Sequence, residues 1–307
     1  MSAASVIQFK SEGVTCEADL YVPRRFSESS KTPAVVLGHG FTVARTSLVE
    51  EGRLFAEAGY AALAIDYRHF GGSEGAPRGR LWPFQETEDF KSAIDWLEIQ
   101  PGIDASRMGV WGTSFGGGIV THVAAHDIRV KACVAQAPIM DGDYWIRSLN
   151  RECDYLAIRQ YLLEARRRRA RQGGDPAISR LTPAADGFTP MPADPVMIAD
   201  VSDWHARTGS PLMHGAPEIT IESFERVMEF DVTHTAAKIA PRAYCILQLT
   251  GRDVYHPQLP IQAAYRAAGQ PKRMLSIPIA QLDCYKPEGR ARTIGAAIEF
   301  FDDFLRS

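Results

Sequence analysis

A serine between two glycines is the first pattern in this sequence that could do covalent chemistry. Gly112-Thr113-Ser114-Phe115-Gly116 follows a short apolar segment and precedes a helical pattern over residues 115–126. A serine on such a strand-to-helix turn is exposed for nucleophilic attack, and the flanking glycines permit the sharp backbone turn. The free N–H groups at the start of the helix also stabilise negative charge beside the serine. The motif therefore predicts that Ser114 is the nucleophile of an acyl-transfer reaction.

The segments around this motif alternate between strand-like and helix-like patterns. Eight segments have the length and apolar content of strands: 5–10, 17–22, 34–41, 61–67, 108–114, 130–138, 243–251 and 273–278. Five segments have helical periodicity: 48–59, 84–99, 115–126, 260–268 and 291–305. Near-continuous apolar strands that alternate with helices are typical of a mostly parallel sheet covered on both faces. The sequence predicts an α/β fold with an eight-stranded sheet, in which the first two strands pair antiparallel.

One long segment interrupts this alternation. Between the strand that ends at Pro138 and the one that begins near Ala243, the sequence shows helical patterns and a proline-rich part over residues 182–195. A structureless loop of that length is implausible in a compact domain, so we expect a largely helical cap. The predicted organisation is a core of residues 1–139 and 231–307 with a cap of residues 140–230. The cap should cover the carboxyl ends of the strands, where open α/β sheets bind ligands.

Composition limits the classes of function. The chain has 307 residues, 45% of them hydrophobic and 23% charged, with a net charge of −3. That balance gives no reason to expect binding to nucleic acid or to an anionic membrane, and we expect a cytoplasmic protein. The five cysteines, Cys16, Cys133, Cys153, Cys245 and Cys284, lack CxxC spacing. They predict neither a disulfide framework nor a zinc site, and we expect no metal or organic cofactor.

Several motifs together resemble a known superfamily. These are GHGFT near residue 39, DYRHFGGSEG at 66–75, DFKSAIDWL at 89–97, GIDASRMGVWGTSFGG at 102–117 and LTGRDVYHP at 249–257. With them the chain resembles the α/β-hydrolases over nearly its whole length outside the cap. Within the superfamily it is similar to the dienelactone-hydrolase and acyl-peptidase-like branch, which includes hydrolases, thiohydrolases and acyl transferases of polyketide pathways.

The resemblance implies further site residues. The backbone N–H groups of Phe41, after the His39-Gly40 pair, and of Phe115 would form the oxyanion hole. Asp253 matches the family's acid in the loop after the seventh strand, where a carboxylate can orient a histidine. Asp141, after the sixth strand, is the rival acid, although it could simply cap a helix.

The base is the difficulty. The order of serine, acid and histidine in this superfamily places the histidine after the eighth strand, where this chain has Gln281. A glutamine amide does not titrate near neutral pH and cannot take the proton of Ser114. Three explanations stay open: a variant in which glutamine has replaced the base histidine, a natural protein that binds without acylation, or another histidine as base. For the last, His256 is nearest but awkward because it shares a loop with Asp253, and His205 and His214 lie in the cap.

The cap provides the indications about substrate. Aromatic and methionine side chains suggest an apolar lining for an extended, polyketide-like acyl group, with Tyr144, Trp145 and Trp204 as the expected contacts. The remaining members of this set are Tyr155, Tyr161, Phe188, Met191, Met197 and Met213. The arginine-rich run over residues 164–174 is either a solvated helix face or a docking surface for an acyl-carrier protein.

The expected activity is hydrolysis or transfer of an ester, lactone or thioester through an acyl-Ser114 intermediate, disabled if Gln281 really stands for the base. The alternatives are a non-hydrolytic acyltransferase, cyclase or binding protein on the same fold, or a C–C bond hydrolase. A homodimer is plausible.

Overall fold

The centre of the molecule is a twisted sheet of eight strands. A computed structural model describes residues 4–174, 177–179, 189–192, 194–208 and 218–306. The strands lie in the order β1-β2-β4-β3-β5-β6-β9-β10. Their bounds are Ser5–Ser11 (β1), Val14–Tyr21 (β2), Thr32–Gly38 (β3), Ala61–Ile65 (β4), Ile103–Thr113 (β5), Val130–Gln136 (β6), Ala243–Leu249 (β9) and Lys272–Ile277 (β10). Only β2 pairs antiparallel with its neighbours β1 and β4, so the predicted mostly parallel α/β sheet is confirmed.

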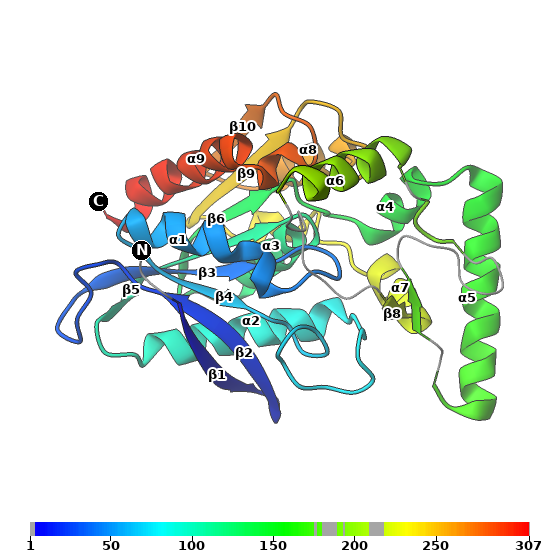
Figure 1. Cartoon of the computed structure of the whole chain (residues 1–307), viewed down its shortest axis with the longest axis horizontal. Coiled ribbons are helices and arrows are strands. Elements are labelled where there is room, and N and C mark those ends of the chain that lie inside the picture. Colours follow the sequence, from blue (N-terminus) through cyan, green and yellow to red (C-terminus); the bar gives the residue numbers. More distant parts are fainter. Residues whose placement is uncertain (1–3, 175–176, 180–188, 193, 209–217, 307) are drawn as a thin grey trace.

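Helices cover both faces of this sheet (Figure 1). On one face, α1 (Val49–Glu57) and α9 (Pro287–Leu305) pack on each other and on the central strands. On the other, α2 (Pro83–Glu98), α3 (Phe115–His126) and α8 (Gln258–Ala267) contribute to a separate buried cluster. Every residue of β3, β4 and β9 is buried, which explains why these strands read as unbroken apolar runs.

The residues between β6 and β9 form the additional elements at the right of Figure 1. They are α4 (Gly142–Ser148), α5 (Glu152–Gln172), β7 (Ala177–Ser179), α6 (Pro195–Thr208), β8 (Glu218–Thr220) and α7 (Ile221–Met228). The expected helical character is present, and the short antiparallel pair of β7 and β8 is an addition that the sequence pattern did not indicate. The expected cap limits, residues 140–230, stay a prediction.

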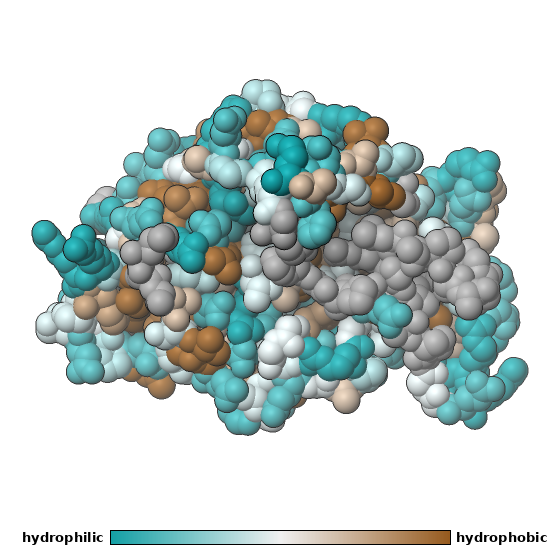
Figure 2. Space-filling view, viewed as in Figure 1, coloured by the Kyte–Doolittle hydropathy of each residue, from teal (hydrophilic) through white to brown (hydrophobic). Residues whose placement is uncertain are grey.

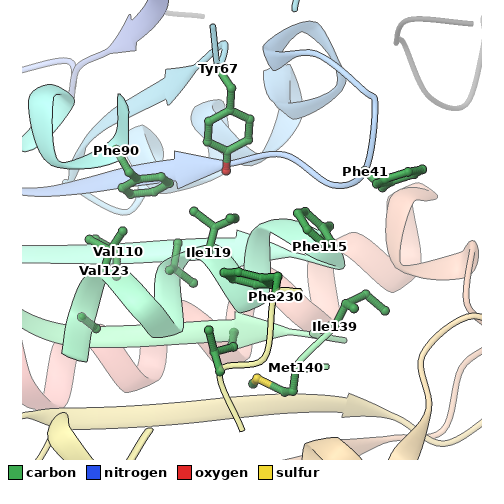
Figure 3. Close-up of a cluster of buried hydrophobic side chains, with 14 of the residues drawn as sticks. Phe41, Tyr67, Phe90, Val110, Phe115, Ile119, Val123, Ile139, Met140 and Phe230 are labelled. Atoms are coloured by element: carbon green, nitrogen blue, oxygen red, sulfur yellow. The ribbon is translucent and has the colours of Figure 1, made fainter. Parts of the chain in front are cut away.

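A buried aromatic cluster connects the core to these inserted elements (Figure 3). Phe115 and Phe230 lie with ring centroids 5.5 Å apart, and Phe41 meets Trp145 of α4 edge to face at 5.1 Å. Edge-to-face aromatic pairs of this kind stabilise a core beyond the area that they bury. None of the helices among the described residues is long and apolar enough to cross a membrane.

Candidate active site

Ser114 occupies the turn between β5 and α3. Its backbone has φ 55° and ψ −122°, a conformation that a non-glycine residue adopts only when its surroundings impose it. A Cβ atom at Gly112 would collide with the carbonyl of Gly116, and one at Gly116 would collide with the carbonyl of His39. Both glycines are therefore needed for the close approach of the backbone segments that present Ser114.

A histidine and an aspartate complete a hydrogen-bonded chain with this serine. The Nε2 atom of His256 lies 3.0 Å from Ser114 Oγ, and its Nδ1 atom lies 2.7 Å from Asp253 Oδ2. Nucleophile, base and orienting carboxylate in this geometry are the three parts of a serine-based acyl-transfer site. The site is set at the carboxyl ends of two parallel strands, β5 and β9.

The protonation states follow from the environment of the carboxylate. Burial alone would raise the pKa of Asp253. The charge and hydrogen bond of His256, with backbone N–H groups of Tyr255 and His256, outweigh burial and hold this pKa below its usual value. An ionised carboxylate only accepts hydrogen bonds, so Nδ1 of His256 carries the proton and donates it. When the imidazole is neutral, the lone pair of Nε2 then faces the hydroxyl of Ser114, which is the arrangement that a general base requires.

This geometry corrects the expectation that the base is missing and that His256 is awkwardly placed. Oδ1 of Asp253 accepts from the backbone N–H groups of Tyr255 at 3.0 Å and of His256 at 3.1 Å. These two bonds fold the loop into a tight turn of the kind that aspartate favours. An extended chain would separate residues three apart by about 10 Å, whereas the turn brings the imidazole back onto the carboxylate. Gln281 is therefore not evidence of a disabled site.

Gln281 lies where the sequence placed it, after β10, and it lines the same pocket as Ser114 and His256. Its side chain is 4% exposed, and its Oε1 atom accepts from the backbone N–H of Val254 at 2.9 Å. The position expected for the histidine thus holds a side chain that bonds to the loop carrying the actual imidazole.

The residues expected at the oxyanion hole lie beside the nucleophile. A Cβ atom on Gly40 would stand 3.7 Å from Ser114 Oγ, so the loop before Phe41 passes directly over the serine. Phe115 is the first residue of α3, where backbone N–H groups have no acceptor within the helix. The two rings belong to the buried aromatic cluster, with centroids 5.8 Å apart, so the backbone N–H of either residue is the group suited to contact a substrate oxygen.

Asp141, the rival acid, has a different task. Its carboxylate accepts from the backbone N–H of Tyr144 at 2.9 Å and caps the first turn of α4. Burial is the main reason that the pKa of Asp141 is raised, and this shift is opposite in direction to the shift at Asp253.

The three expected cap contacts behave differently. Trp145 is 2% exposed and lines the pocket, but Tyr144 is 37% exposed and does not. Successive helical residues point about 100° apart, so the two cannot share one face of α4. Trp204 on α6 packs with Met197 and Val201 against a core cluster and is also absent from the pocket lining. Tyr144 and Trp204 do not line this pocket, and their contact with a substrate stays a prediction.

The pocket itself is mainly apolar. Besides the residues already described, the lining among the described residues consists of Val43, Ser47, Thr113, Met191, Met197, Tyr255, Leu282 and Tyr285. Met191 and Met197 were among the cap side chains expected at a substrate, whereas Tyr155 and Tyr161 lie elsewhere on α5. Phe188, Met213 and His214 lie outside the described residues, as does most of the proline-rich part, and His205 is exposed on α6.

More than half of the chain matches one protein family. Residues 12–179 match the model of the X-Pro dipeptidyl-peptidase (S15) family. The chain belongs to the S15 family. The matched segment includes Ser114 and its flanking glycines, but it ends before Asp253 and His256. The family match therefore covers Ser114, whereas Asp253 and His256 are brought into the site only by the hydrogen-bond geometry described above.

Relatives with curated names match part of the chain. The quorum-quenching protein AidA of Acinetobacter baumannii is 42% identical over 137 residues, which cover 44% of this chain and 44% of that protein. Thiohydrolase aneE of Aspergillus aculeatus is 31% identical over 122 residues, 39% of this chain and 38% of that protein. These matches span less than half the length of either relative.

The polyketide transferase grgF of Penicillium sp. is similar in both sequence and structure. It is 32% identical over 118 residues, 38% of this chain and 40% of that protein. The crystal structure of the α/β-hydrolase GrgF superposes with a TM-score of 0.81 and 20% identity over 99% of both chains. At that identity the superposition shows the shared α/β-hydrolase fold.

His256 is the functional residue that the sequence interpretation undervalued. It is the one histidine after Asp253, and it lies next to Pro257, which disfavours a helical conformation of the residue before it. An aspartate three residues before such a histidine is the signal that could have found the pair, because aspartate favours turns over its own next residues.

Proposed function

We propose that this protein is an acyl-transferring serine enzyme that forms an acyl-Ser114 intermediate and passes the acyl group to water or to another nucleophile. The observation that carries the proposal is the hydrogen-bonded chain from Ser114 Oγ through His256 to Asp253, with links of 3.0 and 2.7 Å. This series of hydrogen bonds includes a nucleophile, a base and a carboxylate, so we propose an active enzyme rather than a disabled one.

The first half of the reaction forms the intermediate. Ser114 Oγ attacks the carbonyl carbon of the substrate while its proton passes to Nε2 of His256. The ionised Asp253 stabilises the resulting imidazolium through Nδ1–H. Collapse of the tetrahedral adduct breaks the bond to the leaving group, which takes the proton from His256 and departs as a thiol or alcohol.

The second half returns the enzyme to its starting state. Water or an acceptor hydroxyl gives a proton to His256 and attacks the acyl carbon, after which Ser114 leaves and regains the proton. In both halves the negative oxygen would accept from the backbone N–H groups of Phe41 and Phe115. Two fixed donors of this type contribute on the order of 100- to 1,000-fold each to turnover.

A thioester is the substrate class that we favour. The apolar lining formed by Phe41, Trp145, Met191 and Met197 suits a hydrocarbon acyl group. Two of the relatives are named as a thiohydrolase and a polyketide transferase, which supports acyl transfer from a carrier thioester. The methionines can adapt to acyl groups of different shape.

An acyl-carrier protein is the partner that this substrate would bring. The helix α5 contains six arginines against three acidic residues, and much of its surface in Figure 2 is hydrophilic, although Leu156 and Leu163 are also exposed. Tyr155, Ile158, Leu162 and Ala165 are its buried residues, so the opposite face is solvated. A basic helix face can attract an acidic carrier protein, with binding that weakens as salt increases.

Two experiments test the reaction, and a third, binding of an acyl-carrier protein at two salt concentrations, tests the partner. Incubation with a fluorophosphonate, followed by intact-mass measurement, should give one adduct on the protein and none on Ser114→Ala. Steady-state rates on p-nitrophenyl esters and N-acetylcysteamine thioesters should then favour the thioesters. Absence of the adduct would indicate a binding or cyclase protein that does not acylate. Carrier-protein binding that ignores ionic strength would remove α5 as its docking surface.

A further inference from the structure

The segment after β10 lies directly against the loop after β9. The backbone N–H of Thr250 donates to Ile277 at 2.9 Å, and that of Gly251 donates to Ile279 at 3.1 Å. A Cβ atom on Gly251 would stand 2.5 Å from the carbonyl of Ile279, so a larger residue would force the two segments apart. The conformation of one segment is therefore coupled to the position of the other.

Gln281 bonds to the residues on either side of the catalytic acid. Its backbone N–H donates to the carbonyl of Arg252 at 3.1 Å, and its Oε1 atom accepts from the N–H of Val254 at 2.9 Å. Because a backbone N–H can only donate, the oxygen of the amide must face Val254. Asp253 is thus held between two hydrogen bonds from one buried side chain and its backbone.

The chemistry of an amide suits this position. A glutamine keeps the acceptor for Val254 at every pH and places no charge beside Asp253 and His256. Its Nε2 amino group forms no hydrogen bond with the described residues, and Gln281 is part of the pocket lining. The amide oxygen is therefore committed to the loop, and the amide nitrogen beside it is a neutral donor.

We propose that Gln281 is a positioning residue that holds Asp253 and His256 in line with Ser114. The inference rests on the proposed function, since it assigns a task within that same site. A displacement of reacting groups by 1 Å can cost about 100-fold in rate, so the loss of one loop anchor is expected to reduce turnover without abolishing it.

The test compares two substitutions at Gln281 with a matched control. Gln281→Met keeps the length of the side chain but removes the acceptor, and should lower kcat by about 10- to 100-fold with little change in KM. Gln281→Glu retains an acceptor oxygen but adds a charge beside Asp253 and His256, so it should recover only part of that loss. Gln8→Met, the same replacement at an exposed residue of β1, should leave kcat and the thermal midpoint unchanged.

A spectroscopic measurement separates this inference from the proposed function. The proton of His256 between Nδ1 and Asp253 should give a strongly downfield NMR resonance in the unmodified protein. That signal should weaken in folded Gln281→Met and remain in Gln281→Glu, whether or not Ser114 reacts with the fluorophosphonate. A folded Gln281→Met that retains both the resonance and the parent kcat would overturn the positioning role. Failure of the parent to form an adduct while the resonance depends on Gln281 would overturn only the acyl-transfer proposal.

Discussion

The loops after β9 and β10 lie side by side, yet they contribute different chemistry to one pocket. The loop after β9 carries Asp253 and His256, the proposed acid and base, whereas the loop after β10 contributes Gln281, Leu282 and Tyr285. The order serine, acid, histidine along the chain is retained, but the histidine comes one strand earlier than expected. What matters to the proposed reaction is that an imidazole reaches Ser114 Oγ, and both loops contribute residues to the pocket beside that serine.

The two loops also differ in how they are held. The first is folded by the carboxylate of Asp253 through its own backbone N–H groups. The second is anchored from outside, since the hydroxyl of Tyr285 lies 2.9 Å from Thr113 Oγ1 and Lys286 pairs with Asp200 of α6 at 2.7 Å. Gln281 joins the two loops, since its Oε1 atom accepts from the backbone N–H of Val254 and its own N–H donates to the carbonyl of Arg252.

The largest effect should follow removal of the imidazole itself. His256→Ala leaves Ser114 without a proton acceptor, and loss of the base in a triad lowers turnover by about a million-fold. The measurement is kcat on the preferred ester or thioester. His205→Ala, on the exposed face of α6, is the matched control and should retain full activity. A loss at His205 instead of His256 would place the base in the cap.

The acid should have the next largest effect. Asp253→Asn keeps the size of the side chain but can favour the wrong tautomer of His256, and a change of this type lowers kcat by about 10,000-fold in a serine triad. Asp141→Asn should leave kcat unchanged, because asparagine also caps a helix well. Equal losses in both variants would mean that the rival acid contributes to catalysis.

A histidine at position 281 tests the comparison of the two loops directly. Gln281→His should give no gain in kcat/KM, since His256 already holds the place beside Ser114, and a fall of up to about tenfold is expected from the disturbed loop. Rates on one ester substrate, with Gln8→His as control, are sufficient. A gain of a hundred-fold or more would show that the second loop is the natural place of the base.

The fold could be predicted from the sequence because burial on both faces leaves a strong pattern. The apolar runs of β3, β4 and β9, and the glycines around Ser114, each have one physical interpretation. His256 could not be assigned with the same ease, because its place depends on the turn that Asp253 imposes on three residues. The absence of Tyr144 and Trp204 from the pocket lining has a related reason: an aromatic residue in a cap packs against whatever lies beneath it, and that neighbour is set by tertiary structure.

The smallest effect concerns stability in acid and again contrasts the two loops. Asp253 has a folded pKa below its ordinary value, chiefly because His256 and the backbone donors outweigh the opposing effect of burial. Its contribution to stability is therefore complete above the unfolded pKa, near 4, and is lost as pH falls through the lower folded value. The thermal midpoint of Asp253→Asn should lie a few degrees below that of the parent at neutral pH, and this gap should close as pH falls below about 4.

Asp283 of the second loop, whose side chain is 40% exposed beside Lys286, is the matched position. Asp283→Asn should leave the midpoint nearly unchanged at neutral pH, because exposed ion pairs contribute little. If the two variants followed the same pH dependence, Asp253 would be no more strongly held than a surface carboxylate, and the contrast between a catalytic loop and a supporting loop would not hold.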